Sequence, residues 1–259
     1  MVYKLVTFNL KRTSDKNTKH SLKIRAEAIK AFLEKTSPDI LGTQELTYPM
    51  LETMKEILKE YSVVGTGRNG GNKGEFTAIF YKKDVFDLIK DDTFWLSGRP
   101  KEPNSRSWLA MFPRICTWCI LKIKETGKII RIYNTHLDHL SPLSRIKSIN
   151  LINKYAEKYD YDELSGTILM GDFNASPKSS TYKHGLNFFE DSTYSMLVRR
   201  GFDRLRTYHG FRGKVRGLPI DYIFTSKNIK LNKAFIDNRL YAQIYPSDHY
   251  PVIAEVTVN

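Results

Sequence analysis

Short apolar runs of strand character recur along the whole chain, and helical patterns separate only some of them. The runs are rich in Val, Ile, Tyr and Phe and are bounded by turn residues. The helical spacing of apolar residues predicts helices over residues 22–34, 46–60 and 142–159. The predicted strands cover residues 3–9, 40–43, 61–65, 76–81, 115–123, 129–134, 167–170, 220–225 and 252–258.

The order of these elements constrains the fold class. Strands and helices alternate in the first part of the chain, whereas consecutive strands follow in the middle. A chain that alternated throughout would build one parallel sheet with helices on both faces. The mixture instead predicts an α/β fold of four layers, a sandwich in which two mixed β-sheets pack face to face and helices flank them.

Length and composition predict one globular unit. The chain has 259 residues, of which 41% are hydrophobic and 27% charged, and it contains no repeat, low-complexity segment or evident linker. We therefore expect a single domain over residues 1–259. No signal-peptide segment is evident, and no apolar run approaches the roughly 18 residues of a membrane helix. We expect a cytoplasmic protein without membrane contact, and the sequence implies no protein partner.

The two cysteines form a C-x-x-C motif that we interpret as part of the core. Cys116 and Cys119 lie inside a predicted strand, where residues three apart point to opposite faces of the sheet. A zinc site would need further ligands of this kind, and the sequence has no other cysteine. Both thiols are therefore expected to be buried as small apolar groups.

A glycine-rich segment matches the G-x-G-x-x-G pattern of dinucleotide-binding proteins but lacks its context. More glycine and then a predicted strand follow Gly65, Gly67 and Gly70. A dinucleotide site needs a helix directly after the pattern. We interpret the segment as a flexible loop between two strands.

The net charge of +13 favours an anionic partner, either a nucleic acid or a phosphorylated small molecule. The charge is spread along the chain, and its densest part is the polar, basic stretch 11–20. That stretch is either a solvated loop or a basic lip that attracts a phosphate backbone.

Polar side chains collect where the predicted strands end. Charges beside buried strands are costly unless they are paired or bind a metal, and these side chains meet if the strands share one sheet edge. Carboxylate and amide oxygens without cysteine suit Mg²⁺ or Mn²⁺, which leaves positions for water and phosphate. The combination suits metal-assisted hydrolysis of a phosphate ester. The residues are Asn9, Gln44, Glu45, His136, Asp138, His139, Asp172, Asn174, Asp221, Asp248 and His249.

The order of these motifs resembles the endonuclease/exonuclease/phosphatase superfamily, which includes pancreatic-type deoxyribonucleases, abasic-site endonucleases and bacterial sphingomyelinases. The similarity extends from residue 7 to residue 249, and it is greatest to a bacterial subgroup of unsettled substrate. The resemblance implies the sandwich fold and metal-dependent phosphoester hydrolysis, but no particular substrate. The motifs are Thr-Phe-Asn9, Gly-Thr-Gln-Glu45, Asn-Thr-His136-Leu-Asp138-His139, Gly-Asp172-Phe-Asn174, Ile-Asp221-Tyr-Ile and Ser-Asp248-His249.

The resemblance also implies roles for the residues on the metal and water side of the site. Glu45 would bind the metal, Asn9 would contact metal or phosphate, and Asp248 would support the metal. Asp172 would align and deprotonate the attacking water. Asn174 would hydrogen-bond the phosphate and its transition state.

The histidines would act on the phosphate and the leaving group. His249 would donate to the phosphate, with Asp221 orienting its ring. His136 would touch the phosphate or help to protonate the leaving oxygen. In the deoxyribonuclease branch a glutamate pairs with that histidine, and Glu75 lies where such a partner would fall. The abasic endonucleases have a tyrosine in place of His136, so the chain departs from them there.

The substrate is less constrained than the reaction. Arg114 and His209 lie in aromatic segments and are expected, with His139, to contact the substrate. The charge favours a phosphodiesterase of the nuclease type. The compact length favours, as an alternative, a phosphatase for a small phosphorylated metabolite or sugar phosphate. A third hypothesis is a non-catalytic module that binds nucleic acid or phosphate, and the full motif set disfavours it.

Overall fold

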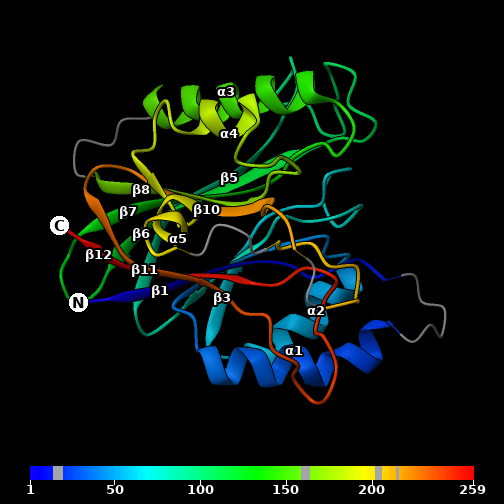
Figure 1. Cartoon of the computed structure of the whole chain (residues 1–259). Coiled ribbons are helices and arrows are strands. Elements are labelled where there is room, and N and C mark those ends of the chain that lie inside the picture. The colour runs from blue at the N-terminus through cyan, green and yellow to red at the C-terminus, as the bar shows by residue number, and fades with distance from the viewer. Residues whose placement is uncertain (14–19, 159–163, 202–205, 214–215) are drawn as a thin grey trace.

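Two six-stranded mixed sheets face each other, and helices cover their outer faces (Figure 1). The computed structural model describes residues 1–13, 20–158, 164–201, 206–213 and 216–259. This architecture confirms the predicted four-layer α/β sandwich. Across the described ranges, no helix combines the length and the apolar character needed to cross a lipid bilayer.

The first sheet is built around a parallel pair of strands. β1 and β2 run in the same direction, so Asn9 and Gln44 end their strands side by side. β12 pairs antiparallel with the other side of β1. The order is β11-β12-β1-β2-β4-β3, with β11 (Ile229–Ile236), β12 (Val252–Val258), β1 (Tyr3–Asn9), β2 (Ile40–Gln44), β4 (Ile79–Lys82) and β3 (Tyr61–Val64).

The second sheet repeats this plan. β7 and β8 are parallel, which places His136 opposite Asp172. β10 runs antiparallel to β8 and places Asp221 opposite the same Asp172. The order is β5-β6-β7-β8-β10-β9, with β5 (Phe86–Trp95), β6 (Ile115–Ile123), β7 (Ile129–His136), β8 (Leu164–Asp172), β10 (Asp221–Thr225) and β9 (Asp191–Ser192).

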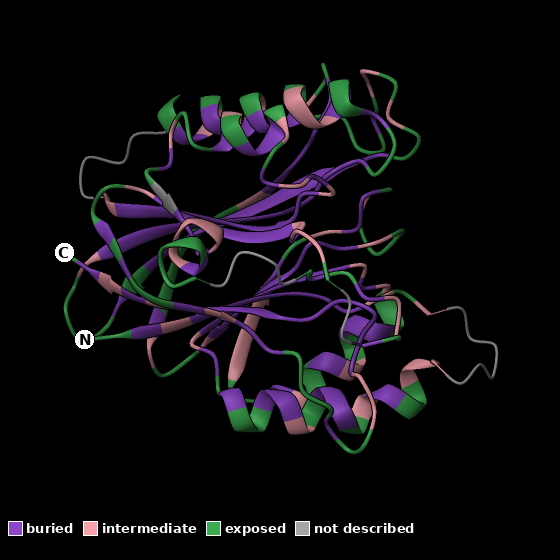
Figure 2. Cartoon of the chain, viewed as in Figure 1, coloured by how far each residue is buried: buried purple, intermediate pink, exposed green. Residues whose placement is uncertain are grey.

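Helices cover the two outer faces and leave most strand residues outside the edge strands buried (Figures 1 and 2). α1 (Leu22–Thr36) and α2 (Tyr48–Ile57) pack on the first sheet through a layer that includes Phe32 and Met54. α3 (Pro142–Lys158) and α4 (Ser180–Gly185) cover the second sheet. α5 (Thr193–Arg199) contacts β11 through Leu197. Three apolar layers therefore hold the four structural layers together.

The cysteines lie as the strand interpretation predicts. Cys119 is in the apolar layer between the sheets, and Cys116 is in the layer on the helix side of the same strand. Burial raises the pKa of both thiols. The glycine-rich segment joins β3 to β4 without a following helix, as expected.

Several elements were not predicted. β5 and β11 are edge strands, in which residues 87–91 of β5 and residues 230, 232 and 233 of β11 are exposed. Charged residues such as Lys90 and Lys233 therefore interrupt the apolar pattern, as is common at sheet edges. β9, α4 and α5 are too short for a periodic signal. The last predicted residue of the third helix, 159, lies outside the described residues.

One buried amide crosses between the sheets beside the strand ends. Asn134 of β7 donates from Nδ2 to the carbonyls of Thr43 and Ala78, at 2.9 Å each. Its Oδ1 accepts from Gln44 Nε2 at 2.7 Å. Because Asn134 and Gln44 are fully buried, these bonds are shielded from water. They fix how the sheets face each other next to Glu45 and His136.

We predict that Asn134→Ala lowers the free energy of unfolding by about 2–4 kcal/mol, because it leaves buried partners unsatisfied and opens a cavity. Urea denaturation measures the change. Asn232→Ala is the matched control, since Asn232 makes an exposed side-chain bond to Thr257 and should cost less than about 0.5 kcal/mol. Equal losses in the two variants would contradict a special role for Asn134.

Candidate active site

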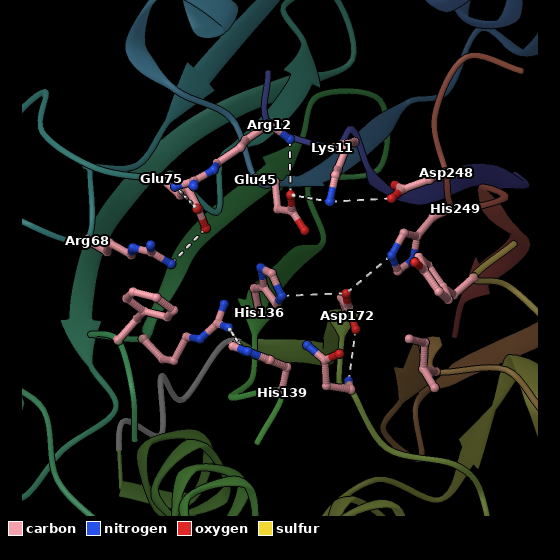
Figure 3. A pocket seen from close by; sticks show the side chains of 15 residues that line it. Lys11, Arg12, Glu45, Arg68, Glu75, His136, His139, Asp172, Asp248 and His249 are labelled. Atoms are coloured by element: carbon pink, nitrogen blue, oxygen red, sulfur yellow. Dashed lines mark hydrogen bonds and ion pairs between the residues drawn. The ribbon is translucent and has the colours of Figure 1, made fainter. Parts of the chain in front are cut away.

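Polar residues from the edges of both sheets meet around one cavity of about 440 Å³ (Figure 3). The first sheet contributes Glu45, after β2, and Asp248 and His249, just before β12. The second sheet contributes His136 and Asp172, from the ends of β7 and β8. The structure thus brings together residues that are up to about 200 positions apart. The sequence predicted that they would meet if the strands shared one sheet edge, whereas they meet between the edges of two sheets.

Asp172 lies at the centre of this group. Its Oδ2 accepts from Asn9 Nδ2 at 3.0 Å and lies 3.6 Å from His136 Nε2 and 3.9 Å from His249 Nε2. Its Oδ1 accepts from the backbone N–H of Asn174 at 2.8 Å. Asp172 is only 1% exposed, so protein groups shield its carboxylate from solvent almost completely.

The local sequence explains how Asp172 is placed. Gly171 has φ +149°, and a side chain there would collide with the Thr135 carbonyl of the neighbouring strand. Asn174 adopts a left-handed conformation with φ 47°, which asparagine tolerates well. Its amide bond to Asp172 forms a turn of the Asx type, and its Nδ2 donates to Leu137 O at 3.1 Å.

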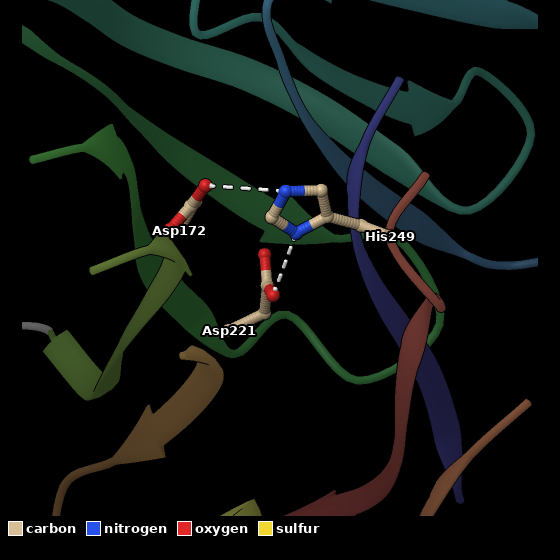
Figure 4. Close-up of side chains that lie close together, drawn as sticks. All are labelled: Asp172, Asp221 and His249. Carbon is tan, nitrogen blue, oxygen red and sulfur yellow. Dashed lines mark hydrogen bonds and ion pairs between the residues drawn. The ribbon is translucent and has the colours of Figure 1, made fainter. Parts of the chain in front are cut away.

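His249 and Asp221 form a buried pair beside Asp172 (Figure 4). His249 Nδ1 donates to Asp221 Oδ2 at 3.0 Å, which directs Nε2 toward Asp172. Burial disfavours the imidazolium, but Asp221, and then Asp172 and Asp248, raise the pKa of His249 to about 10. The ring is therefore a cation that can donate from Nε2 at neutral pH.

Burial has opposite consequences for the two groups beside this pair. Burial and the neighbouring Asp221 raise the pKa of Asp172 to about 7. Burial and the nearby Arg114 hold the pKa of His136 well below its usual range. A carboxyl with a pKa near working pH suits a general base, and a neutral imidazole can accept or donate one proton.

Two carboxylates frame a place for a cation. Lys11 Nζ lies 4.0 Å from Glu45 Oε2 and 3.5 Å from Asp248 Oδ2, so these groups can share one positive charge. Against the effect of burial, Lys11 and Asn9 lower the pKa of Glu45 and keep it ionised. The oxygen donors of Glu45 and Asp248 fit Mg²⁺ or Mn²⁺.

Asn9 orients the carboxylates of the site. Its Nδ2 donates to Glu45 Oε1 and to Asp172 Oδ2, at 3.0 Å each, and its Oδ1 accepts from the backbone N–H of Lys11.

A second acidic group has ligand spacing for a metal. Ligand atoms of Asp172, Asp221 and His249 lie within 4.8 Å of one another. His249 Nδ1 is already bonded to Asp221, and this explains the spacing as a hydrogen-bonded chain. Glu45 and Asp248, the predicted metal side, are not part of it.

Glu75 lines the cavity but has other partners than the one expected. Its Oε2 accepts from Arg68 NH1 at 2.7 Å, and its Oε1 lies 3.3 Å from Arg12 NH1. Among the described residues, His136 is not one of its ion-pair partners. The expected pairing of Glu75 with His136 is therefore not what the structure shows, because two arginines attract the carboxylate more strongly than a neutral imidazole.

Arg114 and His139 form the wall beside His136. Arg114 is 5% exposed and its NH2 lies 3.2 Å from His139 Nδ1. No carboxylate of the described residues lies within ion-pair distance of Arg114, and its buried Nε lacks a hydrogen-bond partner. His139 stacks on Phe112 at 6.2 Å, and Phe112 covers Arg68 at 5.0 Å. This wall offers unpaired donors and an aromatic face to a ligand.

His209 does not line this cavity, contrary to the expectation; its neighbour Tyr208 does. His209 is 3% exposed and stacks on Tyr250 at 3.9 Å. Burial lowers its pKa to about 4, so the ring packs as a neutral group.

Asp138 is also fully buried, and its Oδ1 accepts from the backbone amides of Leu140 and Ser141 before α3.

Six lining residues were not named as site candidates from the sequence: Lys11, Arg12, Arg68, Phe112, Tyr208 and Ile220. Their loops carried signals, since Arg68 lies in the glycine-rich segment and Tyr208 lies in an aromatic one. Lys11 and Arg12 begin the basic stretch 11–20, and both face the cavity. Residues 14–19 of that stretch lie outside the described residues.

A sequence model of the Endonuclease/Exonuclease/phosphatase family matches residues 6–249. The chain belongs to this family. A Bacteroides vulgatus endonuclease/exonuclease/phosphatase has a similar structure, with a TM-score of 0.91, 26% identity and full coverage of both chains. A Bacteroides thetaiotaomicron mannosyl-6-phosphatase gives a TM-score of 0.86 and 29% identity over 98% of this chain and 99% of that one.

More distant structures share the fold alone. The human Nocturnin catalytic domain, solved with bound sulfate, gives a TM-score of 0.76 and 20% identity, and the match covers 100% of this chain and 95% of that domain. Among curated proteins, no sequence matches the chain. Members of this family are hydrolases that act on phosphoesters.

We predict that Mg²⁺ stabilises the protein through Glu45. Metal at about 100 times its Kd contributes about 2.7 kcal/mol. That corresponds to a rise in Tm of roughly 5–10 °C for a chain of this size. Thermal melts with Mg²⁺, Mn²⁺ or EDTA measure the rise, and Glu45→Gln should abolish most of it. Glu52→Gln is the matched control, because Glu52 lies outside the cavity and pairs with Lys55 at the surface. A full rise in Glu45→Gln would exclude Glu45 as the ligand.

Proposed function

We propose that the protein is a phosphoester hydrolase that depends on Mg²⁺ or Mn²⁺ and acts by in-line attack of water on phosphorus. One observation carries the proposal: the buried Asp172 carboxylate opens onto the cavity between His136, His249 and the carboxylate of Glu45. A base, a cationic donor and a place for a cation are thus within reach of one phosphate group. In this proposal the whole chain, residues 1–259, acts as one domain.

Each side chain has a defined part in the reaction. Asp172 orients the water and takes its proton. His249, held by Asp221, donates from Nε2 to a phosphate oxygen and stabilises the charge that develops there. Asn174 hydrogen-bonds the phosphate. Glu45 holds the divalent cation with support from Asp248, and the bound cation adds charge stabilisation.

The substrate in this proposal is a small phosphomonoester, such as a sugar phosphate. The cavity of about 440 Å³ is compact, and the guanidinium of Arg114, which contacts His139 but has no carboxylate partner among the described residues, suits an oxygen-rich, anionic ligand. Phe112 offers an exposed ring on which the flat face of a sugar can pack. The mannosyl-6-phosphatase that is 29% identical over nearly the whole chain supports the same class.

Nucleic acid is the second candidate, and the net charge of +13 favours it. A nuclease-type enzyme would bind several phosphates along a backbone, whereas a phosphatase of small molecules needs one. Tyr208, which is 39% exposed beside His249, could stack on a base as well as on a sugar. The two candidates share the reaction and differ in the number of phosphate contacts.

We predict that Asp172→Asn and His249→Ala each lower kcat by about 10³-fold or more, since each removes a group that acts on the transition state. Turnover of p-nitrophenyl phosphate with Mg²⁺ measures the loss, and an unchanged melting profile shows that the fold survives. Asp92→Asn and His184→Ala are controls, because their side chains pair with Lys101 and Asn150 outside the cavity. Near wild-type turnover in either active-site variant would refute the roles.

We predict hydrolysis of sugar phosphates with a weak response to salt. A protein that binds 6–10 phosphates of a nucleic acid loses roughly 10³–10⁵ in affinity between 50 and 200 mM salt. The screen covers sugar and inositol phosphates, p-nitrophenyl phosphate, bis-p-nitrophenyl phosphate, plasmid DNA and RNA, each with both metals. Preferred cleavage of DNA or RNA with a steep salt response would select the nuclease candidate. Metal binding without hydrolysis of any phosphoester would leave a non-catalytic binding module.

A further inference from the structure

A short segment, residues 207–210, bonds to both halves of the imidazole–carboxylate pair. Thr207 is fully buried, and its Oγ1 accepts from the backbone amides of Ile220 at 3.0 Å and Asp221 at 3.3 Å. Its carbonyl accepts from Tyr250 N, next to His249, at 2.8 Å. One residue therefore links the start of β10 to the residue after the catalytic histidine.

The same segment also forms hydrogen bonds to the backbone just before His249. The amides of His209 and Gly210 both donate to the carbonyl of Asp248, at 2.8 Å and 3.1 Å. The ring of His209 stacks on Tyr250 with an interplanar angle of 16°. Tyr208, between these anchors, pairs with His249 in an isolated β-bridge and turns its side chain into the cavity.

These bonds matter because Asp221 and His249 come from different sheets. Asp221 begins β10 of the second sheet, whereas His249 precedes β12 of the first. The 3.0 Å bond between their side chains requires their backbones to keep a fixed separation. A displacement of about 1 Å at such a site can cost about 10²-fold in rate. A segment that bonds to both backbones sets this separation.

We propose that residues 207–210 are a positioning element for the Asp221–His249 pair and that the Thr207 hydroxyl is its central group. The inference rests on the proposed function, since it gives that pair a part in hydrolysis. Thr207 touches neither the cavity nor the reacting atoms. It acts through Asp221, whose amide it holds, and through His249, whose neighbour it holds.

Thr207→Val tests the proposal because it removes the hydroxyl and keeps the shape. We expect kcat to fall by about 10- to 100-fold while KM changes by less than about 3-fold, since the pair acts on the transition state more than on substrate binding. Thr207→Ser keeps the hydroxyl and should restore kcat. Thr225→Val is the matched control: Thr225 lies on the same strand as Asp221, is fully buried, and its hydroxyl has no hydrogen-bond partner among the described residues.

A readout independent of turnover separates this proposal from the proposed function. In metal-free protein, the Nδ1 proton of His249 should give a downfield NMR resonance because it is bonded to Asp221. Thr207→Val should shift or broaden this resonance, and Thr225→Val should not. If the wild type hydrolyses no phosphoester, the proposed function fails and the resonance alone decides the positioning role.

Two results would overturn the positioning role. One is a Thr207→Val protein with wild-type kcat and an unchanged His249 resonance. The other is an equal loss in Thr225→Val, which would assign the effect to core packing. If Thr207→Val does not fold, Thr207→Ala removes the same hydroxyl with a smaller side chain, and the same fall in kcat and change in resonance are required.

Discussion

The contact between Asn9 and Asp172 joins the two sheets at the edge where the site lies, and the proposed chemistry depends on that contact. Asn9 ends β1 and Asp172 ends β8, so their side chains meet only if the sheets approach closely and in one register. Gly42 allows this approach, because a side chain there would collide with Met170 of the other sheet. Packing between the sheets is therefore a condition for assembling the site as well as a source of stability.

This arrangement buries charge, and the charges must stabilise one another. An isolated carboxylate or imidazolium in the interior costs several kcal/mol. Asp221 raises the pKa of His249, and the cation in turn opposes the rise in the pKa of Asp172. The compensation is incomplete, since Asp221 Oδ1 is buried and has no partner among the described residues. The residual cost is typical of a site arranged for reactivity.

The sequence predicted the strand ends better than the loops. Asn9, Glu45 and Asp172 follow apolar runs, and parallel neighbours bring such ends together regardless of loop length. His249 precedes β12, whose antiparallel pairing with β1 brings the start of β12 to the same edge. Loop geometry obeys no such rule, so the Arg68–Glu75 pair could not be read from spacing. The edge strands β5 and β11 were missed because their exposed residues interrupt the apolar pattern. The loop residue Phe112 and the burial of His209 were also missed, because contacts with distant segments determine both.

The contrast between strand ends and loops also bears on substrate specificity. In the proposed function, the groups assigned to the phosphate lie on or next to strand ends. The cavity residues proposed to face the rest of a substrate lie on loops: Arg68 between β3 and β4, Phe112 before β6, and Tyr208 before β10. Loops change without loss of the sandwich, so relatives can keep the fold and cut different phosphoesters. Family membership therefore indicates the type of bond that is cut, and we expect the loop residues around Arg114 to determine which molecule carries it. Tyr208 is the exception, because the segment that places it also holds the Asp221–His249 pair, and a change there would alter specificity and rate together.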